Sequence, residues 1–295
     1  MRDSLTIRIG NCTHNDARLV LEPYSDSEIL EVTGFVRGPF SEFAKTLTAD
    51  FKLRPVRQAG AKAASAEVLV MEPCYWTPKL PFLYELHLKL KLADGSEEVA
   101  RLRTGIKRLH VEGCSLRLQG KRIVLRGLRC NSPDDQMMRL ACEQETALVV
   151  GSPSESVCES ASRLGVPLIA DLRDVVEPWQ DICRKLDWYP AVCLVLLKVD
   201  QLTGIGGGWK WPQHSLVAAM ASASSTATEF SSVKYQALAV ELASGERPPG
   251  WLATTDNPVF ALSSGTASSI EDARALCDRW QTELAPEFDL AGYIV

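Results

Sequence analysis

The sequence lacks a Cys-x-x-Cys pair, although it has nine cysteines in 295 residues. Structural zinc sites and redox dithiols need closely spaced cysteines, so the spacing argues against both. Several cysteines lie inside apolar runs, as Cys193 does, which is typical of small buried side chains. Scattered free thiols fit a reducing compartment. We therefore expect a cytoplasmic protein without a metal or other cofactor.

Long apolar runs and dense basic clusters are missing too. No segment approaches the roughly 18 apolar residues of a membrane span, and residues 1–6 lack the apolar core of a signal peptide. The net charge is a mild -5, so neither nucleic acid nor a membrane surface is an expected partner. The glycine cluster at 204–208 lacks the spacing of a nucleotide-binding fingerprint.

The first hundred or so residues follow the period of β-strands. In residues 84–92 apolar side chains occupy every second position and polar ones lie between them, which predicts a half-buried strand. Asp94-Gly95 then supplies a tight turn, and 98–102 begin the return strand. Shorter runs of this kind occur at 5–9, 28–34, 47–53 and 67–71. Several strands separated by turn signals predict an antiparallel sandwich.

From about residue 122 the pattern changes, because apolar runs of strand length now alternate with helix-like segments. Such runs are typical of parallel strands that are buried on both faces. The candidate strands are 123–125, 147–150, 166–170, 191–197, 215–220, 233–240, 251–255 and 290–295. Eight strands in βα alternation predict a (β/α)8 TIM-type barrel. A doubly wound open sheet is the alternative.

The junction of the two halves contains three ordered motifs. Residues 75–84 (Y-W-T-P-K-L-P-F-L-Y) resemble the W-S-P-E-x-P-x-L-Y signature near the end of the immunoglobulin-like domain in glycoside hydrolase family 2. Residues 103–108 are similar to that family's F-G-F-R strand, and 116–127 resemble F-x-L-N-G-K-P-V-x-L-R-G, which leads into the first barrel strand. The tryptophan and prolines of the first motif would also form a rigid, aromatic-anchored corner in any sandwich.

The resemblance implies a multidomain chain. Residues 1–112 would form an immunoglobulin-like β-sandwich, and residues 113–295 a glycosidase-like barrel. The family's N-terminal jelly-roll domain has no counterpart in this expectation. A carbohydrate is the implied ligand.

The resemblance also implies a catalytic pair. Residues 188–200 parallel N-H-P-S-V-x-x-W-S-L-G-N-E, whose glutamate is the general acid/base, and Asp200 takes its place. Residues 248–256 resemble K-P-x-x-x-T-E, whose glutamate is the nucleophile, and Asp256 falls there. Both aspartates are expected at the C-terminal ends of barrel strands, where such active sites are built.

Further positions of the resemblance are candidate substrate contacts. Residues 164–171 are similar to the family's third strand, G-L-x-V-x-x-E, and end in Asp171. Arg126 and Asn131, which follow the expected first strand, complete the candidate set. Other sugar-contacting positions depart from the family: the second strand lacks its arginine and histidine, and the sixth lacks Asn-x-Tyr.

Aspartate changes the geometry that such a pair can offer. Retaining glycosidases hold their carboxyl groups about 5–5.5 Å apart, and inverting enzymes about 6.5–9.5 Å. Each aspartate withdraws its carboxylate by one C–C bond, so the gap would widen by up to about 3 Å, into the inverting range.

Three hypotheses follow: a fold that keeps a binding cleft without catalysis, a working glycosidase with an altered acid pair, or an unrelated two-domain protein. Simple structural roles also stand beside the catalytic ones. Asp256 could begin a turn before Asn257-Pro258, and Asp200 and Asp171 could cap helices.

The outer face of the last expected barrel strand needs a covering element. The last expected strand finishes at the final residue, so the apolar outer face beside it needs a cover. Residues 270–284 have helical periodicity and could lie across that face. A second copy of the chain could cover it instead, and we expect self-association through this edge.

Overall fold

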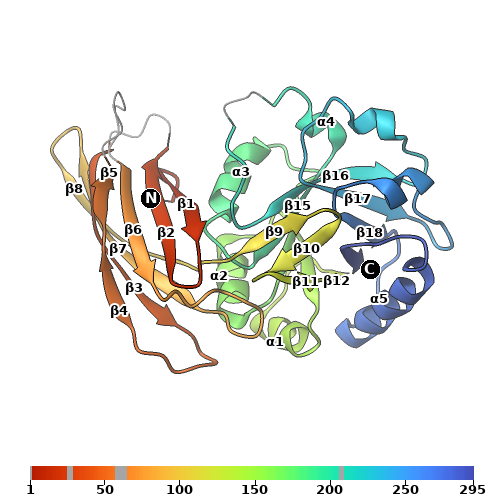
Figure 1. Cartoon of the computed structure of the whole chain (residues 1–295), viewed down its shortest axis with the longest axis horizontal. Helices are drawn as coiled ribbons and strands as arrows, with labels where there is room; N and C mark the ends of the chain where they lie inside the picture. The colour runs from red at the N-terminus through yellow and green to blue at the C-terminus, as the bar shows by residue number, and fades with distance from the viewer. Residues whose placement is uncertain (1, 25–28, 57–64, 206–208) are drawn as a thin grey trace.

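The computed structural model describes residues 2–24, 29–56, 65–205 and 209–295. The chain forms an antiparallel β-sandwich followed by a closed barrel of parallel strands (Figure 1). The predicted architecture is confirmed, and the alternative of a doubly wound open sheet is wrong.

The sandwich consists of two four-stranded antiparallel sheets, ordered β1-β2-β6-β5 and β4-β3-β7-β8. Its clearest predicted strand is β7, in which Leu86, Leu88 and Leu90 are buried in the core between the sheets. The strands are β1 (Leu5–Cys12), β2 (Asp16–Pro23), β3 (Ile29–Phe40), β4 (Ala49–Lys52), β5 (Arg54–Val56), β6 (Ser65–Met71), β7 (Leu83–Leu92) and β8 (Glu97–Thr104).

A small sheet closes one end of the barrel. It comprises β9 (Leu109–Glu112), β10 (Ser115–Leu118) and β11 (Lys121–Ile123). Leu116 of its central strand packs with the side chains that fill the barrel interior. Because β9 pairs with β10 and not with a strand of the sandwich, we propose that the barrel unit begins near residue 109, a few residues before the expected boundary.

The barrel closes because its last strand pairs with its first. All eight neighbouring pairs are parallel. The strands are β12 (Leu125–Arg129), β13 (Ala147–Gly151), β14 (Leu168–Asp171), β15 (Val192–Leu197), β16 (Leu216–Ser222), β17 (Ala237–Leu242), β18 (Val259–Ser263) and β19 (Gly292–Ile294).

The seventh barrel strand differs from the prediction. Residues 251–255 were expected to form it, but Gly250–Thr254 is a short 3-10 helix, η2, and the strand is β18. Both segments are short apolar runs, and only the second can hydrogen-bond to β17 on one side and β19 on the other. The first strand is also displaced, since Lys121–Ile123 pairs with β10 and the barrel strand begins at Leu125.

Helices follow most of the strands on the outside of the barrel. They are α1 (Asp135–Glu143), α2 (Glu155–Leu164), α3 (Trp179–Leu186), α4 (Val199–Leu202), η1 (Ala227–Phe230), η2 and α5 (Ile270–Leu284). Among the described residues, no helix has the length and apolar character needed to cross a membrane.

Helix α5 covers the edge at which the barrel closes. Cys277 lies between β12 and β19, with its Sγ within 3.8 Å of the carbonyl oxygen of Gly127 and 3.2 Å of that of Tyr293. Of the two arrangements that the sequence left open, the chain's own helix therefore covers this face, and the edge argument for self-association loses its basis.

Buried hydrogen bonds join the sandwich to the barrel. The indole Nε1 of Trp76 donates to the carbonyl oxygen of Ser162 at 2.8 Å. The ammonium of Lys107 is fully enclosed and donates to the carbonyl oxygen of Val192 at 2.8 Å. Burial lowers the pKa of Lys107. These contacts link the junction motifs directly to the barrel wall.

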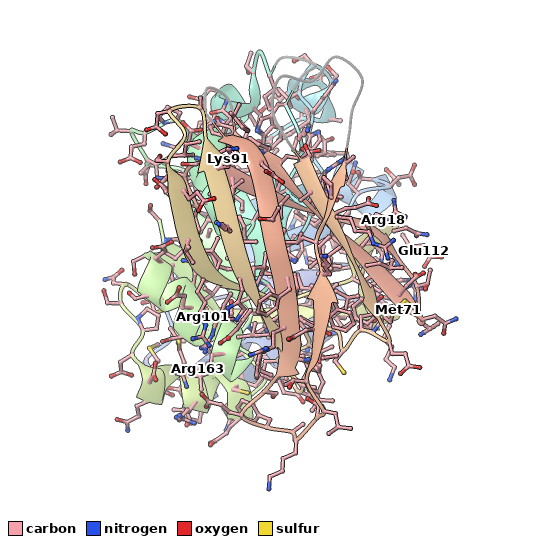
Figure 2. The ribbon with its side chains drawn as sticks, turned by 90° about the vertical axis from the view of Figure 1, so that its left-hand side faces the viewer. Arg18, Met71, Lys91, Arg101, Glu112 and Arg163 are labelled. Atoms are coloured by element: carbon pink, nitrogen blue, oxygen red, sulfur yellow. The ribbon has the colours of Figure 1, made fainter. Side chains whose placement is uncertain are left out.

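Arginines line an open groove between the sandwich and α2. Figure 2 shows Arg101 of β8 close to Arg163 of α2, and both line this groove. Arg101 and Arg103 flank the buried carboxylate of Glu85, while Arg163 pairs with Glu42 at 2.9 Å. The arginines are thus largely compensated by acidic neighbours.

Gly165 provides a test of the packing between the two units. It ends α2 with a φ of +78°, and a Cβ there would lie 2.2 Å from the carbonyl oxygen of Pro78 in the sandwich. Gly165→Ala should lower the free energy of unfolding by about 3 kcal/mol, combining left-handed strain of roughly 1–2 kcal/mol with a backbone clash. Gly95 has a φ of +84° with nothing within 4 Å, so Gly95→Ala should cost only the strain. Equal losses in urea denaturation would contradict the packing described.

Candidate functional site at the barrel mouth

Three charged side chains end strands of the barrel and point into its mouth. Arg129 ends β12, Asp171 ends β14, and Glu241 lies one residue before the end of β17. Two residues before the acids, Ile169 and Ala239 belong to the apolar cluster that fills the barrel interior. Because side chains alternate along a strand, the two carboxylates also face the interior, at its rim.

Ion pairs connect these groups across the mouth. Arg129 Nη2 donates to Glu241 Oε1 at 2.9 Å, and Arg173 Nη1 donates to Glu241 Oε2 at 3.2 Å. Arg173 also holds Asp171 with two parallel bonds of 2.8 and 2.7 Å. We call Arg129, Asp171, Arg173 and Glu241 the mouth cluster.

The mouth cluster balances two positive charges with two negative ones. Its side chains are about one-fifth to one-third exposed. The hydrogen bond to Asp171, followed by the charges of Asp171 and Glu241, raises the pKa of Arg173. Protonating either carboxylate would weaken a guanidinium pair. The arrangement therefore suits the fixed recognition of a polar ligand better than proton donation.

Asp200 lies on the same side of the barrel but outside this cluster. It follows the end of β15 by three residues and is exposed in the first turn of α4. Its Oδ1 accepts a hydrogen bond from the backbone N–H of Gln201 at 3.0 Å. Lys198, and not Asp200, is the N-cap residue of this helix.

Asp256 does not lie where the sequence predicted it. It is exposed in a bend that precedes β18, so it lies at the N-terminal end of the strand, opposite the mouth. The expectation of a facing Asp200–Asp256 pair is therefore wrong. Its position agrees with the simpler interpretation of the sequence, in which Asp256 begins a turn before Asn257-Pro258.

The observed seventh strand follows a different proline from the one that the sequence comparison used. Pro258 directly precedes β18, and the spacing from Pro258 to Ser263 equals the proline-to-glutamate spacing of K-P-x-x-x-T-E. The spacing from Pro249 to Asp256 is two residues longer. The strand thus ends in Ser263, whose Oγ accepts from the N–H of Gly265 at 3.1 Å, and Ser264 follows it.

The three expected substrate contacts have different positions. Arg126 points outward from β12 and binds α5 through Asp278 and Gln281, so it cannot contact a ligand in the mouth. Asn131 is exposed shortly after β12. Asp171 belongs to the mouth cluster; it is not a helix cap, because α3 begins only at Trp179.

Sequence reasoning missed Arg129, Arg173 and Glu241. The available signal was a charged residue near the end of an otherwise apolar strand, as Glu241 is in A-L-A-V-E. No cluster of three or more histidine, cysteine or acidic side chains suited to a metal ion occurs within the described part of the chain.

The fold and the mouth define a (β/α) barrel whose polar groups gather at the C-terminal ends of its strands, the usual place for a site in this architecture. No protein-family model matches the chain. A β-galactosidase from Oenococcus oeni is 29% identical over 84 residues, which are 28% of this chain and 8% of that protein.

Solved structures match nearly the whole chain. A glycosyl hydrolase family 2 member from Bacteroides cellulosilyticus has a TM-score of 0.64 at 15% identity, covering 99% of this chain and 45% of its own. β-Glucuronidase 2 of Bacteroides uniformis, solved covalently bound to cyclophellitol-6-carboxylate aziridine, has a TM-score of 0.60 at 15% identity with the same coverage.

The chain therefore has the fold of glycoside hydrolase family 2 proteins, and the resemblance seen in the junction motifs is confirmed at the level of the fold. It spans less than half of the length of these two structures. At this identity the match establishes the fold, and the chemistry depends on the residues at the mouth.

Glu241→Gln tests the mouth cluster. The amide keeps the shape of the side chain but removes the charge shared by Arg129 and Arg173, so the free energy of unfolding should fall by about 1 kcal/mol at low salt. The loss should shrink in 1 M NaCl because the mouth is partly open to solvent. Glu283→Gln, at an exposed position on α5, should change stability by less than about 0.5 kcal/mol. Equal effects of the two variants in urea denaturation would contradict the network.

Proposed function

We propose that this chain is a divergent glycoside hydrolase family 2 protein that binds carbohydrate at the barrel mouth without hydrolysing it. The observation that supports this most directly is the end of the seventh strand. Ser263 and Ser264 stand there, at the position where the family motif has its nucleophilic glutamate.

Neither glycosidase mechanism is well served by these residues. A retaining mechanism needs a carboxylate nucleophile about 5–5.5 Å from the acid/base, and an inverting one needs two carboxyl groups about 6.5–9.5 Å apart with a water between them. Asp256 lies at the other end of the barrel. A serine hydroxyl is a weak nucleophile without an adjacent base.

The mouth cluster supplies what binding requires. Guanidinium and carboxylate groups are planar, and each has hydrogen-bonding positions beyond those that the ion pairs use. Neighbouring sugar hydroxyls, which both donate and accept, can pair with such groups. Glu241 binds both Arg129 and Arg173, so these side chains are already ordered before a ligand binds. This order lowers the entropy cost of binding. The glycosidase neighbours support carbohydrate as the ligand class.

The compartment remains part of the proposal. All nine cysteines are free, which supports the expectation of a reducing, cytoplasmic environment.

Turnover and binding measured together test this function. With 4-nitrophenyl β-D-glucuronide and β-D-galactoside, we expect no release of nitrophenol above the rate without protein, because the seventh strand offers no carboxylate. Glucuronic acid or galactose, titrated by NMR, should shift signals of the mouth. Arg173→Ala should weaken this binding about tenfold, which corresponds to about 1.4 kcal/mol.

One result would contradict the proposed loss of hydrolysis. Hydrolysis that disappears in Asp171→Asn and in Glu241→Gln would show a working glycosidase that uses the mouth carboxylates as its acid pair. Asp256→Asn, at the far end of the barrel, is the matched control and should change neither rate nor binding.

A further inference from the structure

A cleft of about 400 Å³ lies between the sandwich and the barrel unit. The sandwich contributes residues of β1 and β2 to it, and the barrel unit contributes α3 and residues 209–213. Helix α3 stands beside these strands in Figure 1. None of its lining residues belongs to the mouth cluster, so the cleft is a separate site.

Aromatic rings form one wall of this cleft. Tyr24, Trp209 and Trp211 line it. Trp209 packs edge-to-face against Trp211, with ring centroids 4.4 Å apart, and against Trp179 at 4.9 Å. The guanidinium of Arg184 lies 3.8 Å from the centroid of the Tyr24 ring. This perpendicular packing fixes the indole planes, and the cleft has a rigid, partly exposed apolar wall.

Most of the charges around the wall have a partner in the protein, and Arg184, which also lines the cleft, lies 4.0 Å from Asp181. Glu22 accepts hydrogen bonds from Arg8 at 2.9 Å and from Lys210 at 2.6 Å. Asp187 accepts the backbone N–H groups of residues 213–214, and burial raises the pKa of this carboxyl to about 6. A ligand with a formal charge would have to displace a partner that the protein supplies.

The combination selects a class of ligand. An aromatic wall binds the apolar face of a ligand. The charged side chains and the amides of Gln180 and Gln213 can bind hydroxyls at the edge of that ligand. A sugar ring has both features, since its C–H groups form the faces and its hydroxyls the rim. An organic cation would meet the positive side chains Arg8, Arg184 and Lys210, and an anion would meet Glu22 and Asp187.

We propose that this cleft is a second carbohydrate-binding site, which takes an uncharged ring or short neutral oligosaccharide stacked on Trp209 and Trp211. The volume lies within the range of small-molecule sites, about 300–1,000 Å³. The proposal does not rest on the function of the mouth, because the two sites share no side chain.

Isothermal titration calorimetry of the intact chain tests this inference. The neutral ligands are cellotetraose and β-1,4-galactotetraose, and trigalacturonate is the charged comparison. At least one neutral oligosaccharide should bind. Trp211→Ala should weaken that binding about tenfold or more, while Trp211→Phe, which keeps a ring, should stay within about threefold. Arg173→Ala should leave unchanged the part of the binding that Trp211→Ala removes, because Arg173 does not line the cleft.

Other outcomes would overturn the proposal. They are an absence of binding by both neutral oligosaccharides at 10 mM, binding by trigalacturonate alone, or neutral binding whose affinity and stoichiometry are the same in Trp211→Ala as in the unchanged protein. Binding that is lost in Arg173→Ala but kept in Trp211→Ala would assign the sugar to the mouth, which supports the proposed function and excludes the second site. Near-ultraviolet circular dichroism of Trp211→Phe checks that the wall remains folded.

Discussion

The shared carboxylate of Glu241 is the group on which the chemistry of the barrel mouth depends. Below it the barrel is filled by apolar side chains such as Ile169 and Ala239, and charges at the rim of such a core need partners. Glu241 provides the partner for guanidiniums that come from two sides, Arg129 on the first strand and Arg173 after the third. The result is a fixed polar surface of two guanidiniums and two carboxylates.

Much of the fold could be predicted because the burial of a strand or helix face determines the periodicity of its apolar residues. A strand with one buried face alternates, as β7 does, and a strand buried on both faces is apolar throughout, as β15 is from Val192 to Leu197. Helix α5 likewise shows its inward face through Ala273 and Cys277. These patterns are local, so they identify elements even where their spatial partners are unknown.

The candidate site was less predictable because it depends on register and on long-range pairs. Parallel strands buried on both faces lack alternation, so the sequence could not show that Arg126 points outward and Arg129 inward. The pairing of Arg129 with Glu241 joins residues far apart in the chain. The seventh strand was misplaced because residues 251–255 and Val259–Ser263 are both short apolar runs, and only barrel closure distinguishes them. Because the seventh strand was assigned to residues 251–255, Asp256 was wrongly expected in the active site.

We propose that the seventh strand offers no nucleophilic carboxylate, and covalent labelling tests this proposal most directly. Cyclophellitol-6-carboxylate aziridine is bound covalently in the Bacteroides uniformis structure. Incubating this chain with the same reagent and measuring its intact mass should show no stoichiometric adduct. An adduct of one reagent per chain, mapped by peptide mass spectrometry to Asp171, Asp200 or Glu241, would show that a carboxylate of the mouth acts as the nucleophile and would contradict the account.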